Sequence, residues 1–200
     1  MSTSLTSTEP AQRDLIVSWF HDQRWTADAY LALSATSSHL LELSDGKLTI
    51  LPMPTLSHQR AVKRFVDAAT QWLAGSPGGE VVFAPHPIRL WPGKFREPDA
   101  MVYLGEHTSR MGEQASGVPD VAIEVHSPGT TRLDLVEKFG EYAEAGIAEY
   151  WMVDLAARRV SVFALEGSTY RLVGHHGPGE HATSRMMTGF SIATDDLAPS

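Results

Sequence analysis

The sequence of 200 residues contains no cysteine. Disulfide bonds and thiolate metal sites are therefore excluded, and a cytoplasmic protein is the expectation, because stable disulfides belong to oxidising compartments. The first residues lack a basic start followed by an apolar run, so they do not resemble a secretory signal. No stretch approaches the roughly 20 consecutive apolar residues that a membrane helix needs.

Basic residues are scarce as well. Sixteen Lys and Arg stand against 24 Asp and Glu, which gives a formal net charge of -8 at pH 7. This balance argues against a large non-specific nucleic-acid surface, which would show as a basic excess. It leaves room for a small acidic catalytic site with a local basic strip beside it.

Length and composition favour a single globular domain. Hydrophobic residues make up 42% of the chain, which is enough for a sizeable core. We expect a disordered tail, rich in Ser and Thr, over residues 1–12, and one domain over residues 13–197. The last residues, 197–200, read as a loose end. No internal repeat and no long linker divides the chain.

Hydrophobic spacing and capping residues predict three helices. Thr26 is expected to cap a short helix with Asp28 in its first turn, where the helix dipole favours an anion. An amphipathic helix is predicted from Ser57, with apolar residues at three- and four-residue spacing. A further helix is predicted from Asp134 to Ala145 and is followed by a glycine stop.

The remaining pattern predicts short strands. A hairpin is expected around Asp45-Gly46, a pair typical of two-residue turns. Further strands are predicted at EVVFAPHPIRLW (80–91), PDAMVYL (98–104), PDVAIEVHS (119–127), AEYWMVD (148–154), RRVSVFAL (158–165), TYRLVGHH (169–176) and SRMMTGFSI (184–192). Strands that alternate with long helices indicate an α/β (α+β) domain, with a mixed sheet flanked by helices.

Three residues in order along the chain suggest phosphodiester chemistry. Asp99 starts one predicted strand, Glu124 lies within the next, and Lys138 lies on the helix that follows. Two carboxylates on neighbouring strands, with a backbone carbonyl beside them, form half of the oxygen shell that Mg²⁺ or a similar hard cation takes. A lysine beside them can position the attacking water or stabilise developing negative charge.

The strand pattern places a polar pair on one face. Because side chains alternate along a strand, Glu124 and His126 share a face, and the apolar Val121, Ile123 and Val125 share the other. An unpaired buried polar group costs on the order of 2 to 7 kcal/mol, so this pair needs partners or a metal. At about 100° per residue, Lys138 lies at the edge of its helix's apolar stripe and faces the sheet.

These residues resemble a known family. The stretch PDVAIEVHSPGTTRLDLVEKFGEYAEAGIAEYWMVD is similar to the signature of the Uma-two family of restriction endonuclease-like proteins, within the PD-(D/E)xK nuclease superfamily. The resemblance runs from about Thr26 to Ile192. Its motifs include Glu42, Asp45-Gly46, His58, Asp99, Glu124, Ser127-Pro128, Asp134, Lys138, Tyr142, Gly146 and Glu149-Tyr150-Trp151. It implies a restriction-endonuclease-like fold and an Mg²⁺- or Mn²⁺-dependent endonuclease that cleaves DNA.

The resemblance also implies roles for single residues. Asp99, Glu124 and the carbonyl of Val125 correspond to metal ligands, and Glu42 to an early glutamate that would assist a second metal. The superfamily's usual lysine falls at His126, where the Uma-two family usually has an aliphatic residue. The family uses a helix lysine instead, here Lys138. His126 is thus a departure, open to three roles: a spare metal ligand, a general base, or a partner of a nearby acid.

Two further features leave alternatives open. His58 either caps the helix that it starts or lies over the active site and touches phosphate. Basic residues on that helix and near Asp99 could hold phosphates. These residues are Arg60, Lys63, Arg64, Lys94 and Arg96.

Two other function classes compete with a DNA endonuclease. One is a catalytically silent protein that keeps the nuclease fold as a binding or assembly module, with a homodimer as the expected assembly. The net charge of -8 favours it. The other is a metal-dependent hydrolase of a small phosphate ester. Metal binding separates the silent module from both enzymes, and activity on DNA separates the two enzymes from each other.

Overall fold

The computed structural model describes residues 23–76, 78–126 and 132–198. The tail expected over residues 1–12, the start of the predicted domain and the Ser127-Pro128 motif lie outside the described residues. Within these ranges, no helix has the length and apolar character that crossing a membrane requires.

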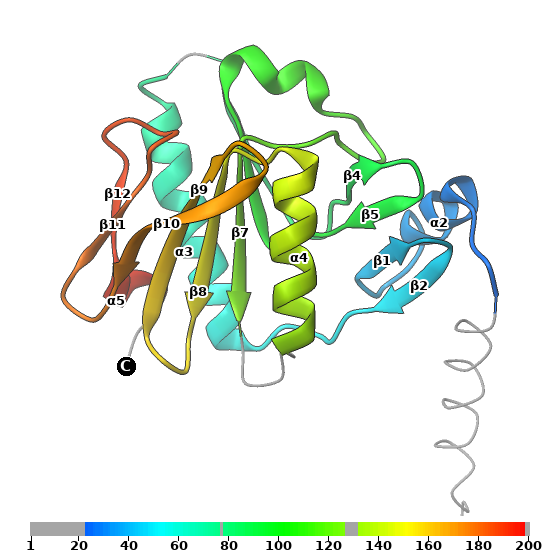
Figure 1. The fold of residues 1–200 in the computed structure, drawn as a ribbon, viewed down its shortest axis with the longest axis horizontal. Helices are drawn as coiled ribbons and strands as arrows, with labels where there is room; N and C mark the ends of the chain where they lie inside the picture. The colour runs from blue at the N-terminus through cyan, green and yellow to red at the C-terminus, as the bar shows by residue number, and fades with distance from the viewer. Residues whose placement is uncertain (1–22, 77, 127–131, 199–200) are drawn as a thin grey trace, which may run out of the picture.

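A six-stranded mixed sheet forms the centre of the fold (Figure 1). Its strand order is β10-β9-β8-β7-β6-β3. The strands are β3 (Glu80–Phe83), β6 (Ala100–Tyr103), β7 (Val121–His126), β8 (Glu149–Asp154), β9 (Arg159–Glu166) and β10 (Thr169–His176). Strands β7 and β8 are parallel and are connected through helix α4 (Arg132–Ala145), whereas the other neighbours are antiparallel. The mixed sheet predicted from the sequence is confirmed.

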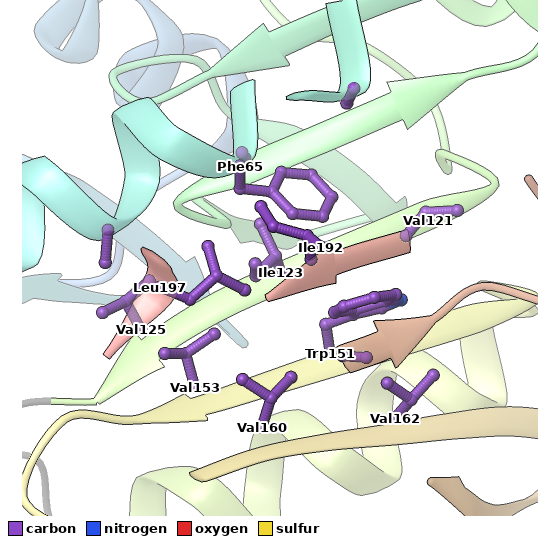
Figure 2. Close-up of a cluster of buried hydrophobic side chains, with 14 of the residues drawn as sticks. Phe65, Val121, Ile123, Val125, Trp151, Val153, Val160, Val162, Ile192 and Leu197 are labelled. Atoms are coloured by element: carbon purple, nitrogen blue, oxygen red, sulfur yellow. The ribbon is translucent and has the colours of Figure 1, made fainter. Parts of the chain in front are cut away.

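Helices cover both faces of this sheet. On one face lies α3 (Leu56–Leu73), which begins after Thr55, whose hydroxyl accepts the hydrogen bond of His58 N. The helix buries Ala61, Phe65 and Ala69, which lie four residues apart and so form one stripe. This stripe packs on Val121, Ile123, Val125, Trp151 and other apolar side chains of the sheet (Figure 2). The other face packs on α4 through a second cluster that includes Tyr142, Ile147 and Tyr150.

A second, four-stranded sheet has the order β2-β1-β5-β4. Its strands are β1 (Leu41–Ser44), β2 (Lys47–Ile50), β4 (Ile88–Trp91) and β5 (Lys94–Arg96), and α2 (Ala27–Ser34) packs beside it. The predicted cap at Thr26 and the hairpin at Asp45-Gly46 are confirmed. Both turn residues have positive φ, 51° and 79°, as a two-residue hairpin turn requires. Strand β5 had no counterpart among the predicted strands.

Two strand predictions are wrong. EVVFAPHPIRLW is not one strand: β3 pairs with β6 in the large sheet, whereas β4 pairs with β5 in the small one. Pro85 and Pro87 stand between them, and proline has no N–H for a strand ladder. SRMMTGFSI contributes only β12 (Ser191–Ala193), which pairs with β11 (His181–Thr183). The segment before β12 instead binds the buried carboxylate of Glu149.

The C-terminal residues are packed rather than loose. A short helix, α5 (Thr194–Leu197), follows β12, and Leu197 and Ala198 are fully buried against the core. Arg158 holds this end in place, because its guanidinium donates to Asp195 Oδ1 at 2.8 Å and to the carbonyl of Ala198 at 3.4 Å. The expected loose end is therefore wrong for these two residues.

Candidate functional site

Asp99 lies just before β6, where that strand meets β7. Ala100 pairs with Ile123, so Asp99 stands at the level of Glu124 on the neighbouring strand. Its Oδ2 accepts the backbone N–H of Val125 at 2.7 Å and lies 3.1 Å from His58 Nε2. Its carbonyl accepts the N–H of Ala84 at 3.1 Å. These contacts fix Asp99 between the two strands.

Glu124 is buried within β7 on the face that α4 covers. Tyr142 OH donates to Glu124 Oε1 at 2.7 Å, and Lys138 Nζ lies 3.1 Å from the same oxygen. Burial raises the pKa of Glu124 to about 7. The charge of Lys138 acts in the opposite direction, and the charge of Asp99 adds to the rise. Burial therefore outweighs the stabilisation that Lys138 gives to the Glu124 carboxylate.

Lys138 joins two carboxylates. Besides Glu124, its Nζ contacts Glu42 Oε1 at 3.1 Å, and the lysine is only 4% exposed. The helix position predicted from the sequence, at the edge of the apolar stripe and facing the sheet, is confirmed. Burial alone would raise the pKa of Glu42, but the charges of Lys138 and Arg96 outweigh it and lower that pKa.

Arg96 and Lys94 form a buried charge network with α4. Arg96 NH1 donates to Glu42 Oε2 at 2.6 Å, and its Nε donates to Glu141 Oε2 at 2.7 Å. Lys94 pairs with Glu141 and also donates to Ser44 Oγ at 2.7 Å. The prediction that Lys94 and Arg96 hold phosphates is contradicted, because both are 4% exposed and engaged by carboxylates. They hold the small sheet against α4.

His126 lies two residues beyond Glu124, also buried. Its Nε2 has no hydrogen-bond partner among the described residues. Burial lowers the pKa of His126 to about 4, and the charge of Lys138 adds to the fall. The imidazole is therefore neutral at pH 7. Its three predicted roles stay predictions.

His58 faces the site rather than the end of its helix. The capping hydroxyl belongs to Thr55, and the His58 ring lies against Asp99. Burial lowers the pKa of His58, but the hydrogen bond to Asp99 and the negative charge of Asp99 outweigh it, so the net shift is upward. The capping role is thus wrong. The structure places His58 beside Asp99, and its contact with phosphate stays a prediction.

Glu97 belongs to the same cluster and was not predicted. It is 3% exposed, and its Oε2 has no partner among the described residues. Burial raises its pKa to about 7, and the neighbouring charge of Glu42 adds to the rise. Its position between Arg96 and Pro98, directly before the Asp99 motif, was the only signal in the sequence. Glu141 was missed too, because nothing marks it among the glutamates of α4.

Asp99 and Glu124 bring carboxylate oxygens, the ligands that hard divalent cations prefer, to neighbouring strands. Across the described ranges, no three His, Asp or Glu side chains gather in a way that could hold a metal ion, so a metal at Asp99 and Glu124 would need a further ligand such as the Val125 carbonyl. In a strand, the N–H and the C=O of one residue point to the same edge. The Val125 N–H points to Asp99, so the Val125 carbonyl faces that edge too. The ladder with β6 ends at Ile123, so β6 does not cover that edge of Val125, where the His58 ring also hydrogen-bonds to the Val125 backbone.

A cleft of about 710 Å³ leads to Asp99 and His58. It lies between α3 and the end of β3, and both residues line it. Their side chains are 14% and 13% exposed, so the site is reached from this side.

Comparisons with known proteins agree with this architecture. The family model of Uma2, described as "Putative restriction endonuclease", matches residues 27–195. Among solved structures, the chain is similar to a "putative nuclease belonging to DUF820 from Anabaena variabilis ATCC 29413". The TM-score is 0.71 at 18% identity, over 86% of this chain and 97% of that one. At this identity the likeness shows the fold. No curated protein matches.

Proposed function

The chain belongs to the Uma-two family, and from this premise we propose that it is a metal-dependent endonuclease that hydrolyses phosphodiester bonds in DNA. The observation that carries the proposal is the position of Lys138. Its ammonium lies 3.1 Å from the carboxylate of Glu124, and Asp99 stands at the same level on the neighbouring strand. An ammonium group beside two carboxylates is the arrangement that metal-dependent phosphoryl chemistry needs.

Asp99, Glu124 and the Val125 carbonyl would hold Mg²⁺ or Mn²⁺. When bound, such an ion polarises a phosphoryl oxygen and lowers the pKa of water. All three ligands are oxygen atoms, which these hard cations prefer. The negative charges of Asp99 and Glu42 lie close enough to disfavour a charged Glu124, and a divalent cation beside these carboxylates would offset that repulsion.

The remaining residues position the carboxylates and stabilise charge. Tyr142 donates to Glu124 and orients it for the metal, while His58 and the Val125 N–H hold Asp99. Lys138 would turn from Glu124 to the phosphate oxygen as negative charge develops there, because a preorganised ammonium stabilises that charge. Glu42 stays paired with Arg96 and keeps the lysine within the cluster.

A plasmid-nicking assay with Mg²⁺ or Mn²⁺ tests the proposal. We expect nicked product from the wild type, none in EDTA, and none from Asp99→Asn. Glu166→Gln is the matched control, because Glu166 lies at the end of β9 and is 55% exposed. A wild type that leaves DNA intact in Mg²⁺ and in Mn²⁺ would contradict the proposal. Turnover of p-nitrophenyl phosphate would then indicate the small-ester hydrolase, and the absence of both turnover and metal binding would indicate the silent module.

A further inference from the structure

The cleft that leads to Asp99 has mostly apolar walls. Met53 and Phe83 are exposed by 71% and 54%, which is unusual for large apolar side chains. The polar lining is sparse. The lining residues are Ser38, Leu40, Met53, Pro54, His58, Gln59, Val62, Lys63, Val66, Asp67, Phe83, Ala84, Pro85 and Asp99. At about 710 Å³, the volume falls in the range of pockets that enclose small molecules.

Phe83 is fixed beside the proposed reaction centre. It pairs with Ala100 across the β3–β6 ladder, and Ala84, the next residue, donates its N–H to the Asp99 carbonyl at 3.1 Å. Strand β3 is the last strand of the large sheet, so its outer edge carries no further strand of that sheet. A ring stacked on Phe83 would therefore lie next to a phosphate held at Asp99.

The charges in the cleft do not match an intact duplex. A duplex presents phosphates on its outside, and proteins meet them with lysine and arginine. Here Lys63 Nζ pairs with Asp67 Oδ2 at 2.6 Å, and His58 pairs with Asp99. The walls instead offer an aromatic face and methionine, with the Gln59 amide and the Ser38 hydroxyl for hydrogen bonds. These groups suit the flat face and polar edge of a nucleobase.

We propose that this cleft receives an unpaired nucleobase, stacked on Phe83, and that the enzyme acts on single-stranded or locally unpaired nucleic acid in preference to intact duplex. The inference rests on the proposed function, and it names the substrate class of the same site. An unpaired base can enter the cleft at a lower cost than a paired base, which must first break its pair and leave the duplex stack.

Binding of a short oligonucleotide tests the proposal independently of cleavage. The probe is a single-stranded 10-mer with one central 2-aminopurine, whose emission falls on stacking, and the same strand annealed to its complement. Both are titrated in EDTA. We expect quenching and tighter binding for the single strand. Phe83→Ala should lose the quenching and weaken binding roughly 5- to 100-fold, the range of one base–aromatic stack, and Phe83→Trp should restore both.

Leu172→Ala is the control, because Leu172 is 56% exposed on β10, at the opposite edge of the sheet. It should bind as the wild type does. Equal affinity for single strand and duplex, or unchanged quenching in Phe83→Ala, would overturn the proposal. So would a second copy of the chain in the cleft, seen as a dimer that Phe83→Ala converts to a monomer without a change in oligonucleotide binding.

Cleavage distinguishes this proposal from the function on which it rests. Wild type that cleaves duplex and single strand equally with Mg²⁺ would refute the substrate class and leave the endonuclease standing. Wild type that binds and quenches the single strand but cleaves neither substrate would refute the endonuclease and leave the base-binding cleft standing.

Discussion

Replacement of His126 by leucine should change how stability depends on pH. The folded protein holds His126 neutral down to a pKa of about 4, whereas the unfolded chain protonates it below about 6.5. The unfolded state therefore binds more protons between these values, so stability is present above pH 6.5 and is lost as the pH falls towards 4. A difference of about 2.5 units corresponds to about 3 kcal/mol. Replacement of His126 by leucine removes this loss of stability at low pH, because leucine does not titrate.

Urea unfolding between pH 4 and 7.5, in EDTA, measures the effect. The free energy of unfolding of His126→Leu, relative to wild type, should increase by about 3 kcal/mol as the pH falls from 7 to 4. Glu124 provides the opposite case. Its folded pKa of about 7 lies above the ordinary 4.5, so its stability contribution is present below 4.5 and is lost as the pH rises to 7. The free energy of unfolding of Glu124→Gln, relative to wild type, should therefore increase as the pH rises. A pH-independent difference for His126→Leu would refute the reasoning.

Three further predictions concern the metal and the buried carboxylates. Millimolar Mn²⁺ should raise the melting temperature of the wild type by mass action, and Glu124→Gln should abolish most of that increase in a thermal melt. Arg96→Met leaves Glu42 with one cation fewer and should lower the free energy of unfolding by about 3 to 5 kcal/mol in urea. Glu149→Ala removes the acceptor of the buried Trp151 indole N–H and of two part-buried backbone N–H groups, and should cost about 4 kcal/mol, while Glu166→Ala stays within about 0.5.

Local patterns predicted most of the fold because each rests on a few adjacent residues. The Asp45-Gly46 turn needs two residues that tolerate positive φ, and α3 needs apolar residues that recur on one face. The segment at 80–91 failed because its apolar residues fit one strand as well as two. Only pairing with β6 on one side and β5 on the other divides it.

The contact between Glu124 and Lys138 was also predictable. Glu124 was placed on its face by strand alternation, and Lys138 by the helical angle from its apolar stripe, and the structure brings the two into contact. The partners of charged residues were not predictable. Arg96 looked like a phosphate ligand because a sequence does not show that a basic residue is buried between two carboxylates from distant segments.

Single-turnover cleavage rates of Lys138→Met and His126→Leu, measured side by side with Mg²⁺, test the central claim most directly. Methionine keeps the stem that covers the edge of the apolar stripe but removes the ammonium. The account predicts a loss of about 10² to 10³-fold for Lys138→Met, the range for one electrostatic stabiliser, and near wild-type activity for His126→Leu. Wild-type rates in folded Lys138→Met, or a severe loss confined to His126→Leu, would contradict it.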